Sequence, residues 1–340
     1  MLAKKLSLPD GFVDWEFAPA FQEKATVEGH PIYLSGMQAT HPQHGEVVGS
    51  SASLVAFPDS SASYELIERI TIVESLSKPA LVLRHETSEA VIGEAKTALV
   101  FPQSSSMEYR FAKSNGVALY STWQEACRRA AMELVERHLI LASWLGITKP
   151  LLMQRVRKTA LHRLKNLYTV EHYDFGCQKT SSFPGTIYVT GVILKARDKG
   201  GSENNYAPLI LGCGAGQSQA ESLLKAEAET WQRLGFLWGE EIPNEDPEFA
   251  AHQLYHQEFY LYPKNHYRID AWLRGDYFDA KKTILPRVLE TRFADLSIEG
   301  AADLRVAKAL ADEAIPLVFG FYRGGLFADL EENRLIHPIA

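Results

Sequence analysis

The 340-residue sequence predicts a single domain of the α+β class, with mixed helices and sheets. Three observations support this prediction. Strand-like and helix-like segments alternate along the chain. No stretch has the low-complexity composition that is typical of a linker between domains. The composition, with 46% hydrophobic and 23% charged residues, is that of a globular protein with a sizeable core.

The strand predictions depend on apolar runs that are rich in β-branched residues. Thr186–Ala196 (TIYVTGVILKA) has few charges and is expected to be a central strand. Shorter strands are expected at Pro31–Leu34, Ala80–Arg84, Pro208–Gly212, Phe259–Leu261 and Pro316–Arg323. The last of these, PLVFGFYR, has the composition of a buried strand near the end of the chain.

Helical periodicity is strongest in three segments, which are Trp123–Leu145, Gln217–Leu237 and Leu304–Ala314. A shorter helix is expected from Ser61 to about Ser75. We expect the helices that carry the motifs described below to pack beside the sheets and to converge on one site.

Charge, cysteine content and hydropathy exclude several classes of protein. A net charge of -7 argues against binding to a nucleic-acid backbone, so we expect no nucleic-acid partner. The three cysteines are widely spaced and form neither a disulfide framework nor a C-x-x-C zinc motif. Met1–Asp10 has no apolar run and does not resemble a secretory signal. No stretch has the length of a membrane span, so we expect a cytoplasmic protein without a membrane partner.

A loose sequence repeat is the most informative feature. Each copy lies on a predicted helix and follows a stretch of small residues. Two copies read E-x-x-E-R and one reads E-x-x-Q-R: Glu65-x-x-Glu68-Arg69, Glu133-x-x-Glu136-Arg137 and Glu229-x-x-Gln232-Arg233. One copy of so short a motif indicates little, but recurrence in matching contexts indicates a shared role.

Helix geometry places the acidic residues of these motifs on narrow stripes. At about 100° per residue, Glu125, Glu133 and Glu136 fall within roughly 80° of arc on a helix that is otherwise mostly apolar. Glu221, Lys225, Glu229 and Gln232 span a similar arc on theirs. An acidic stripe among apolar residues is unfavourable when buried unless cations neutralise it.

Magnesium is the cation that this pattern favours, because it prefers oxygen ligands and is usually held by a few carboxylates together with substrate phosphates. Three helices that present carboxylates to one point would form a nucleotide and metal site. The alternative is that each motif is an exposed ion-pair pattern on a solvated helix. The recurrence and the apolar surroundings favour the site.

Other patterns have ordinary structural explanations. Gly212-x-Gly214-x-Gly216 lacks the spacing of a dinucleotide-binding loop. Cys213 has no histidine near it in sequence and is expected to be a small packing residue rather than a nucleophile. His256 lies in an aromatic segment, where a packed surface or interface is favoured over a metal site.

The arrangement resembles the YcaO family from about Val48 to the C-terminus. The block that runs from Gly116-Val117-Ala118 to Glu136-Arg137 is similar to the hallmark helix of the family. The block from Gly212 to Gln232 is similar to its glycine turn and the following helix, and Ile336-His337-Pro338 is similar to its proline-containing tail. The resemblance implies an N-terminal segment (residues 1–47) of the same unit and a catalytic domain (residues 48–340).

The resemblance also implies ATP and Mg²⁺ as cofactors. The implied metal ligands are Glu65, Glu68, Glu133, Glu136 and Glu229. The implied nucleotide-binding residues are Arg69, Glu125, Arg137, Lys225 and Gln232. Because the family's tail reaches the active site, His337, Pro338 and Ala340 are the implied catalytic residues, although this tail keeps one proline where azoline-forming members commonly have a Pro-x-Pro-x-Pro-like end.

In azoline-forming members, a Cys, Ser or Thr side chain attacks the preceding amide, whose oxygen is then phosphorylated by ATP. By resemblance we therefore expect a precursor-peptide substrate, an E1-like partner that binds its leader, and a flavin-dependent dehydrogenase, as in microcin-type synthetases. A thioamide-forming or amidine-forming enzyme and a noncatalytic scaffold are the alternatives. The complete set of paired carboxylates argues against the scaffold.

Overall fold

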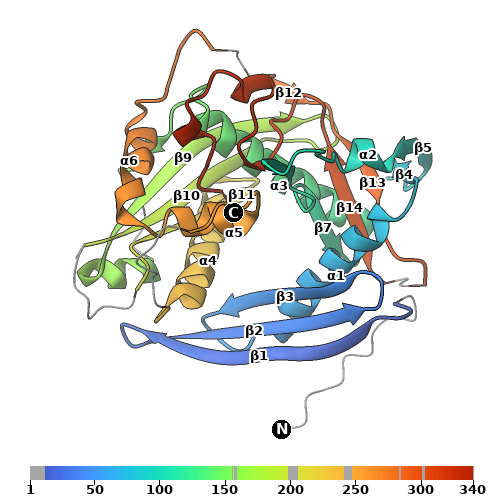
Figure 1. The fold of residues 1–340 in the computed structure, drawn as a ribbon, viewed down its shortest axis with the longest axis horizontal. Helices are drawn as coiled ribbons and strands as arrows, with labels where there is room; N and C mark the ends of the chain where they lie inside the picture. The colour runs from blue at the N-terminus through green and yellow to red at the C-terminus, as the bar shows by residue number, and fades with distance from the viewer. Residues whose placement is uncertain are drawn as a thin grey trace.

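The computed structural model describes residues 12–154, 156, 159–197, 206–240, 247–282, 285–300 and 303–339. Helices and sheets are mixed, which confirms the predicted α+β class. Among the described residues, three larger sheets surround a group of three long helices (Figure 1), and β15 and β6 form a further two-stranded sheet. The segment Met1–Asp10 lies outside the described residues.

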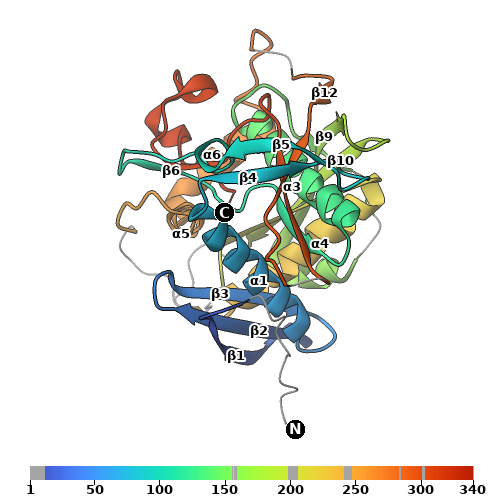
Figure 2. The same ribbon diagram turned by 90° about the vertical axis from the view of Figure 1, so that its right-hand side faces the viewer.

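The first sheet is an antiparallel meander of β1 (Glu16–Val27), β2 (His30–His41) and β3 (Gly45–Ser53), drawn in blue at the bottom of Figure 1. Helix α1 (Asp59–Leu76) lies along it, as the turned view in Figure 2 also shows. The helix approaches β3 closely, since a Cβ at Gly49 would lie 2.3 Å from the helix backbone. The expected domain boundary at Val48 falls within β3.

The second sheet has the strand order β5-β4-β13-β14-β7. Its strands are β4 (Ala80–Arg84), β5 (Val91–Lys96), β7 (Val117–Tyr120), β13 (Arg292–Asp295) and β14 (Arg305–Leu310). Two hydrophobic clusters, one on each side of β14, bury its central residues.

The third sheet has the order β11-β10-β9-β12, with β8 beside β9. Its strands are β8 (Leu151–Leu152), β9 (Tyr168–Thr180), β10 (Ile187–Ala196), β11 (Leu209–Gly216) and β12 (Val288–Leu289). The central part of β10 is buried, as its β-branched sequence predicted.

Two long helices join the sheets. Helix α3 (Trp123–Trp144) packs between the second and third sheets, and α4 (Gln219–Leu237) packs on β10, β11 and the first sheet. Glycines in β11 permit this contact, because a Cβ at Gly212 or Gly214 would lie 2.5 Å from a backbone nitrogen of α4. Gly214 and Gly216, which the resemblance placed in a glycine turn, thus lie in strand β11 together with Gly212.

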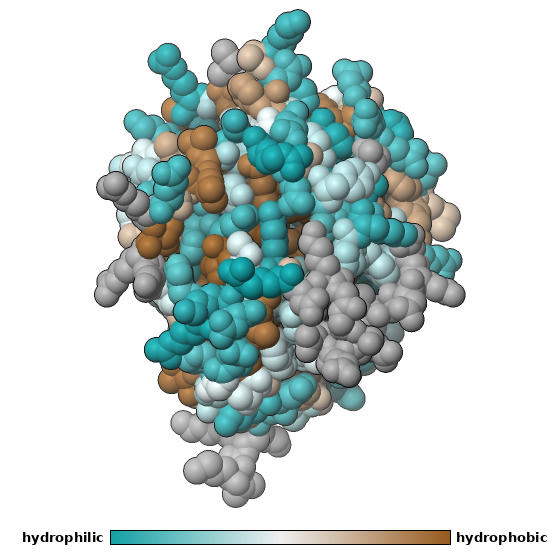
Figure 3. Space-filling view, turned by 90° about the vertical axis from the view of Figure 1, so that its left-hand side faces the viewer, coloured by the Kyte–Doolittle hydropathy of each residue, from teal (hydrophilic) through white to brown (hydrophobic). Residues whose placement is uncertain are grey.

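Short elements complete the fold around this frame. They are α2 (Thr97–Val100), β6 (Tyr109–Phe111), β15 (Val318–Gly320), α5 (Gln253–Phe259), α6 (His266–Arg274) and the 3₁₀ helices Ala160–Asn166, Pro263–Asn265, Gly325–Phe327 and Glu332–Arg334. The face viewed in Figure 3 is mainly hydrophilic and carries separate hydrophobic patches. Among the described residues, no helix combines the length and apolar character needed to cross a bilayer.

Two of the local predictions are wrong. Leu304–Ala314 reads as an alanine-rich helix, but Arg305–Leu310 forms β14 because it pairs with strands on both sides. Phe259–Leu261 was expected to be a strand, but it contains the end of α5 and the turn that follows. In both cases the long-range packing of the segment outweighs its local propensity.

Candidate nucleotide and magnesium site

The carboxylates of the repeated motifs converge from three helices. Helix α1 contributes Glu65 and Glu68, α3 contributes Glu133 and Glu136, and α4 contributes Glu229. Glu68 interacts electrostatically with Glu65 and Glu133, and Glu136 interacts with Glu133 and Glu229. The five side chains therefore form one continuous cluster, which we call the carboxylate cluster.

Burial makes this cluster unfavourable when all its members are charged. Burial, with the charges of Glu133 and Glu65, raises the pKa of Glu68 well above its ordinary value. Burial raises the pKa of Glu133 to about 7, although Arg137 opposes the shift. Burial raises the pKa of Glu136 to about 7 as well, and the charge of Glu229 adds to that shift. A divalent cation would relieve this repulsion.

One backbone amide and an arginine hold Glu65 at the edge of the cluster. Its carboxylate accepts hydrogen bonds from Ser50 N–H at 3.0 Å and from Arg69 Nη2 at 2.5 Å. Arg69 also donates to Val48 O at 2.6 Å, which ties α1 to β3. Burial raises the pKa of Glu65, and Arg69 opposes the shift.

Strand backbones orient two further members of the cluster. The N–H groups of Gly116 and Val117 donate to Glu133. Cys213 N–H donates to Glu229 Oε2 at 2.7 Å, and Arg233 pairs with the same carboxylate at 3.0 Å. Both carboxylates are thus fixed by the strand against which their helix packs, so the cluster is built into the contact between helices and sheets.

Arg137 is the cation at the centre of the site. It lies 3.9 Å from Glu136 and interacts electrostatically with Glu133 and Glu229. Within the described residues, its buried Nε atom has no hydrogen-bond acceptor. A buried donor without an acceptor is unfavourable, and a phosphate oxygen would satisfy it. The site therefore offers carboxylate ligands for Mg²⁺ and a donor for a phosphate, which fits a magnesium nucleotide.

A lysine that the motif analysis did not identify also belongs to the site. Lys308 on β14 is buried and donates to Asn115 O at 2.7 Å and Lys113 O at 3.2 Å. Burial lowers its pKa to about 8, while Glu133 and Glu68 favour its charged form. It was missed because its segment was interpreted as a helix. The available signal was a lysine within the apolar run VAKAL, since a buried lysine needs a charged or polar partner.

Three of the predicted nucleotide-binding residues lie toward the rim. Glu125 is about 12 Å along α3 from Glu133, and hydrogen bonds from Arg128 lower its pKa to about 2. Lys225 is half exposed, donates to Ala215 O at 2.9 Å and lowers the pKa of Glu136. Gln232 is half-buried, one turn after Glu229. The structure thus separates Glu125 from the cluster and leaves Lys225 within its electrostatic reach.

The end of the chain packs into the core beside the site. Ile336 O accepts a hydrogen bond from Tyr260 Oη at 2.5 Å, and His337 donates from Nε2 to Val318 O at 2.9 Å. Burial lowers the pKa of His337 to about 4, and the charge of Arg137 acts in the same direction. Pro338 is buried, and Ala340 lies outside the described residues.

His256 helps to hold this tail. Its Nδ1 donates to His337 O at 3.0 Å, and its Nε2 accepts from Gly320 N–H at 2.8 Å. Both ring nitrogens are therefore engaged within the protein. Cys213 is also buried, and burial raises the pKa of its thiol well above the ordinary value, which agrees with a packing role.

An open cleft borders the carboxylate cluster. It has a volume of about 780 Å³ and is lined in part by Arg69, Ser104–Ser106, Arg110 and Lys113. The carbonyl of Lys113 accepts a hydrogen bond from Lys308, so one wall of the cleft contacts the site directly. None of the five carboxylates lines the cleft itself, which meets the site through Arg69 and Lys113.

Comparison with solved structures identifies the fold. The YcaO protein of Methanopyrus kandleri, bound with AMPPCP and Mg²⁺, matches with a TM-score of 0.54 and 16% identity, over 86% of this chain and 85% of that one. The E. coli microcin synthetase McbBCD complex matches with a TM-score of 0.56 and 11% identity, over 86% and 88%. A heterocyclase in complex with substrate and cofactor matches with a TM-score of 0.55 and 16% identity, over 88% of this chain and 50% of its own.

Sequence comparison identifies the family through a family model and not through an individual relative. No relative with a curated description shows significant sequence similarity to the chain. The family model described as "YcaO cyclodehydratase, ATP-ad Mg2+-binding" matches residues 87–306, which is more than half of the chain and includes the motifs on α3 and α4. ATP and Mg²⁺, the cofactors expected from the sequence, are those in the family's description. The chain therefore belongs to the YcaO family.

Proposed function

We propose that this ATP-dependent enzyme phosphorylates backbone amides of a ribosomally made precursor peptide and converts Cys, Ser or Thr residues into azolines. The observation that carries the proposal is the carboxylate cluster itself, in which five glutamates come from three helices and three of them, Glu133, Glu136 and Glu229, act on Arg137. Such a site suits phosphoryl transfer, which depends on the positioning and the neutralisation of phosphate charge.

In the proposed reaction, the side chain of the peptide attacks the preceding amide carbon and gives up its proton. The resulting oxyanion accepts the γ-phosphoryl group of ATP. The amide nitrogen then loses its proton as the C–O bond breaks, so a C=N bond forms and the amide oxygen departs in phosphate. The products are an azoline, ADP and phosphate, and the peptide has lost the elements of one water.

We assign roles to the chain's residues as follows. The carboxylate cluster would hold Mg²⁺, which neutralises charge on the transferring phosphoryl group when bound. Arg137 would donate its free Nε–H to a phosphate oxygen. Arg69, which lines the cleft, would orient Glu65. The positive charge of Lys308 would offset part of the negative charge of Glu133. Glu125, Lys225 and Gln232 would border the nucleotide.

The tail would position the reacting amide. His337 is fixed within the electrostatic reach of Arg137, so the tail would begin beside the site. We retain His337, Pro338 and Ala340 as proposed catalytic residues in this sense. Residues held by several buried hydrogen bonds lose little entropy when they orient a substrate.

We further propose cytoplasmic partners for the chain: an E1-like protein that binds the leader of the precursor, and a flavin-dependent dehydrogenase. The solved structures of similar fold support such an assembly, because they include a microcin synthetase complex with pro-MccB17 bound and a heterocyclase with its substrate. The fold similarity by itself specifies neither the precursor nor the subunits.

The test is a Glu136→Gln variant assayed with ATP, Mg²⁺, the precursor peptide and its leader-binding protein. We expect this variant to lose ATP-dependent loss of water from the peptide, measured by mass spectrometry, because one cluster charge is removed. Glu258→Gln, which changes an exposed glutamate on α5, is the matched control and keeps full turnover. Full turnover by Glu136→Gln would exclude the assigned site, and an oxygen-to-sulfur mass gain would identify the thioamide reaction instead.

A further inference from the structure

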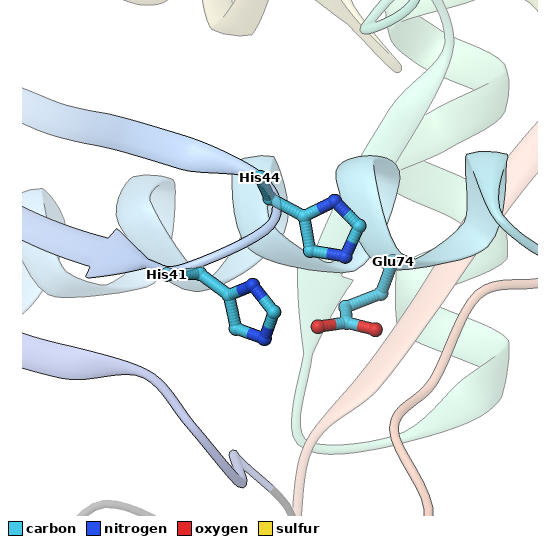
Figure 4. Close-up of side chains that lie close together, drawn as sticks. All are labelled: His41, His44 and Glu74. Carbon is cyan, nitrogen blue, oxygen red and sulfur yellow. The ribbon is translucent and has the colours of Figure 1, made fainter.

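A second group of metal-ligand side chains lies outside the carboxylate cluster. His41 ends β2, His44 lies in the turn before β3, and Glu74 lies near the end of α1. One ligand atom from each lies within 4.8 Å of the others. Figure 4 shows both imidazole rings turned toward the carboxylate of Glu74.

Local sequence and topology produce this arrangement. His41 and His44 are separated only by Pro42 and Gln43, and the tight connection between β2 and β3 keeps both rings on one side of the hairpin. The two rings are stacked, with centroids 4.5 Å apart and an interplanar angle of 28°. The packing of α1 against the first sheet then brings Glu74 to the same place.

Trp15 supports the group from outside. Its Nε1–H donates to Glu74 Oε1 at 2.8 Å, which orients the carboxylate and leaves its other oxygen available. The indole also lies against both imidazoles, with centroid distances of 5.0 Å to His41 and 6.1 Å to His44. Outer partners of this kind orient the ligands of metal sites in proteins.

We propose that His41, His44 and Glu74 bind one divalent transition-metal ion, for which Zn²⁺ is the best match. Two imidazole nitrogens and one carboxylate oxygen form a typical three-ligand set for zinc, and water would complete a tetrahedron. Imidazole is a poor ligand for Mg²⁺, which prefers oxygen. The site is therefore chemically distinct from the carboxylate cluster.

Binding requires one small rearrangement of the turn. Gln43 N–H donates to His41 Nδ1 at 3.1 Å, so this nitrogen now acts as an acceptor. Coordination through Nε2 would place the proton on Nδ1, and coordination through Nδ1 would displace the N–H group. In either case this hydrogen bond is exchanged for a metal bond. The bound ion would clamp the β2–β3 turn onto α1, the helix that carries Glu65 and Glu68.

The test is calorimetric titration of the full-length protein with Zn²⁺, in excess Mg²⁺ so that the carboxylate cluster is occupied. We expect binding of one Zn²⁺, weakened at least ~10-fold by His44→Gln because one of three ligands is removed. Glu74→Gln should weaken binding similarly while it still accepts the hydrogen bond from Trp15. His85→Gln, which changes an exposed histidine elsewhere, should bind like the unaltered chain.

A spectroscopic measurement tests the geometry. Co²⁺ in place of Zn²⁺ should give the intense visible absorption of a tetrahedral site. The His44→Gln and Glu74→Gln variants should both lose this absorption. Circular dichroism of each variant confirms that the fold is intact. If His44→Gln and Glu74→Gln both fold and bind Zn²⁺ as tightly as the unaltered chain, binding is adventitious and the proposal is wrong. No arm uses ATP or peptide, so its failure is separable from failure of the proposed function.

Discussion

Metal binding by the carboxylate cluster should depend steeply on pH. Glu133 and Glu136 both have a pKa raised to about 7. Each is therefore about half ionised at pH 7, about one-tenth at pH 6 and about nine-tenths at pH 8. Since a carboxylate must be ionised to bind a metal, each group contributes about a tenfold gain in affinity between pH 6 and pH 8.

The expected gain from these two groups together lies between ~10-fold and ~100-fold, because they interact and do not titrate independently. Glu68, whose pKa is also raised, adds to this gain. Mn²⁺ in place of Mg²⁺, titrated without nucleotide and followed by electron paramagnetic resonance, measures the affinity. Avoiding ATP removes the titration of its own phosphate. Calorimetry in buffers of different ionisation enthalpy should detect release of at least about one proton at pH 7, because Glu133 and Glu136 are each half protonated and Glu68, whose pKa is also raised, adds to them.

A variant separates the two contributions. Glu136→Gln should bind Mn²⁺ more weakly and lose up to about tenfold of the pH dependence, since Glu133 and Glu68 remain. Glu258→Gln should keep the full dependence of the unaltered chain. Affinity that is constant from pH 6 to pH 8, with no proton release, would refute the reasoning, because it would mean that these carboxylates are ionised before the metal arrives.

Two further predictions concern stability. Between pH ~4.5 and ~7 the metal-free folded state holds protons on Glu133 and Glu136 that the unfolded chain has lost, so its stability falls as pH rises. Glu136→Gln should therefore raise the free energy of unfolding by on the order of 1–3 kcal/mol at pH 8 and by much less at pH 5. Urea titrations at both pH values measure this effect, and equal effects at the two would contradict the prediction. Removal of Ile336–Ala340 should lower stability by several kcal/mol, because two buried isoleucines and buried hydrogen bonds are lost; an unchanged urea midpoint would contradict it.

The motifs on α1, α3 and α4 could be predicted because they are local. The side chains at positions i and i+3 of a helix share a face whatever surrounds the helix. Glu133 and Glu136 therefore had to lie on one stripe of the helix. A stripe of like charges among apolar residues had to be neutralised by cations or hydrated by water. The recurrence of the motif then indicated that several helices share one ligand.

Lys308 and the glycine run could not be placed in this way. The segment around Lys308 has the alanine content of a helix, and it forms a strand only because β13 and β7 flank it, strands that lie far from each other in sequence. A strand was expected to end at Gly212, with a glycine turn after it by resemblance, but β11 continues to Gly216, and Gly212 and Gly214 are small so that α4 can pack on it. The strand around Lys308 depends on contacts between distant segments, and the glycines depend on how α4 packs on the strand that precedes it. Neither contact is recorded in a local pattern.

The sequence by itself determined the composition of the carboxylate cluster, because helix periodicity couples residue spacing to side-chain direction. Only the tertiary structure decided which backbone amides hold each carboxylate, that Lys308 joins them, and that His337 packs within reach of Arg137. The same holds for His41, His44 and Glu74, since the hairpin supplies two ligands and a distant helix turn supplies the third. Burial and strand pairing are properties of the whole chain, so they set the pKa values and the partners that spacing alone leaves open.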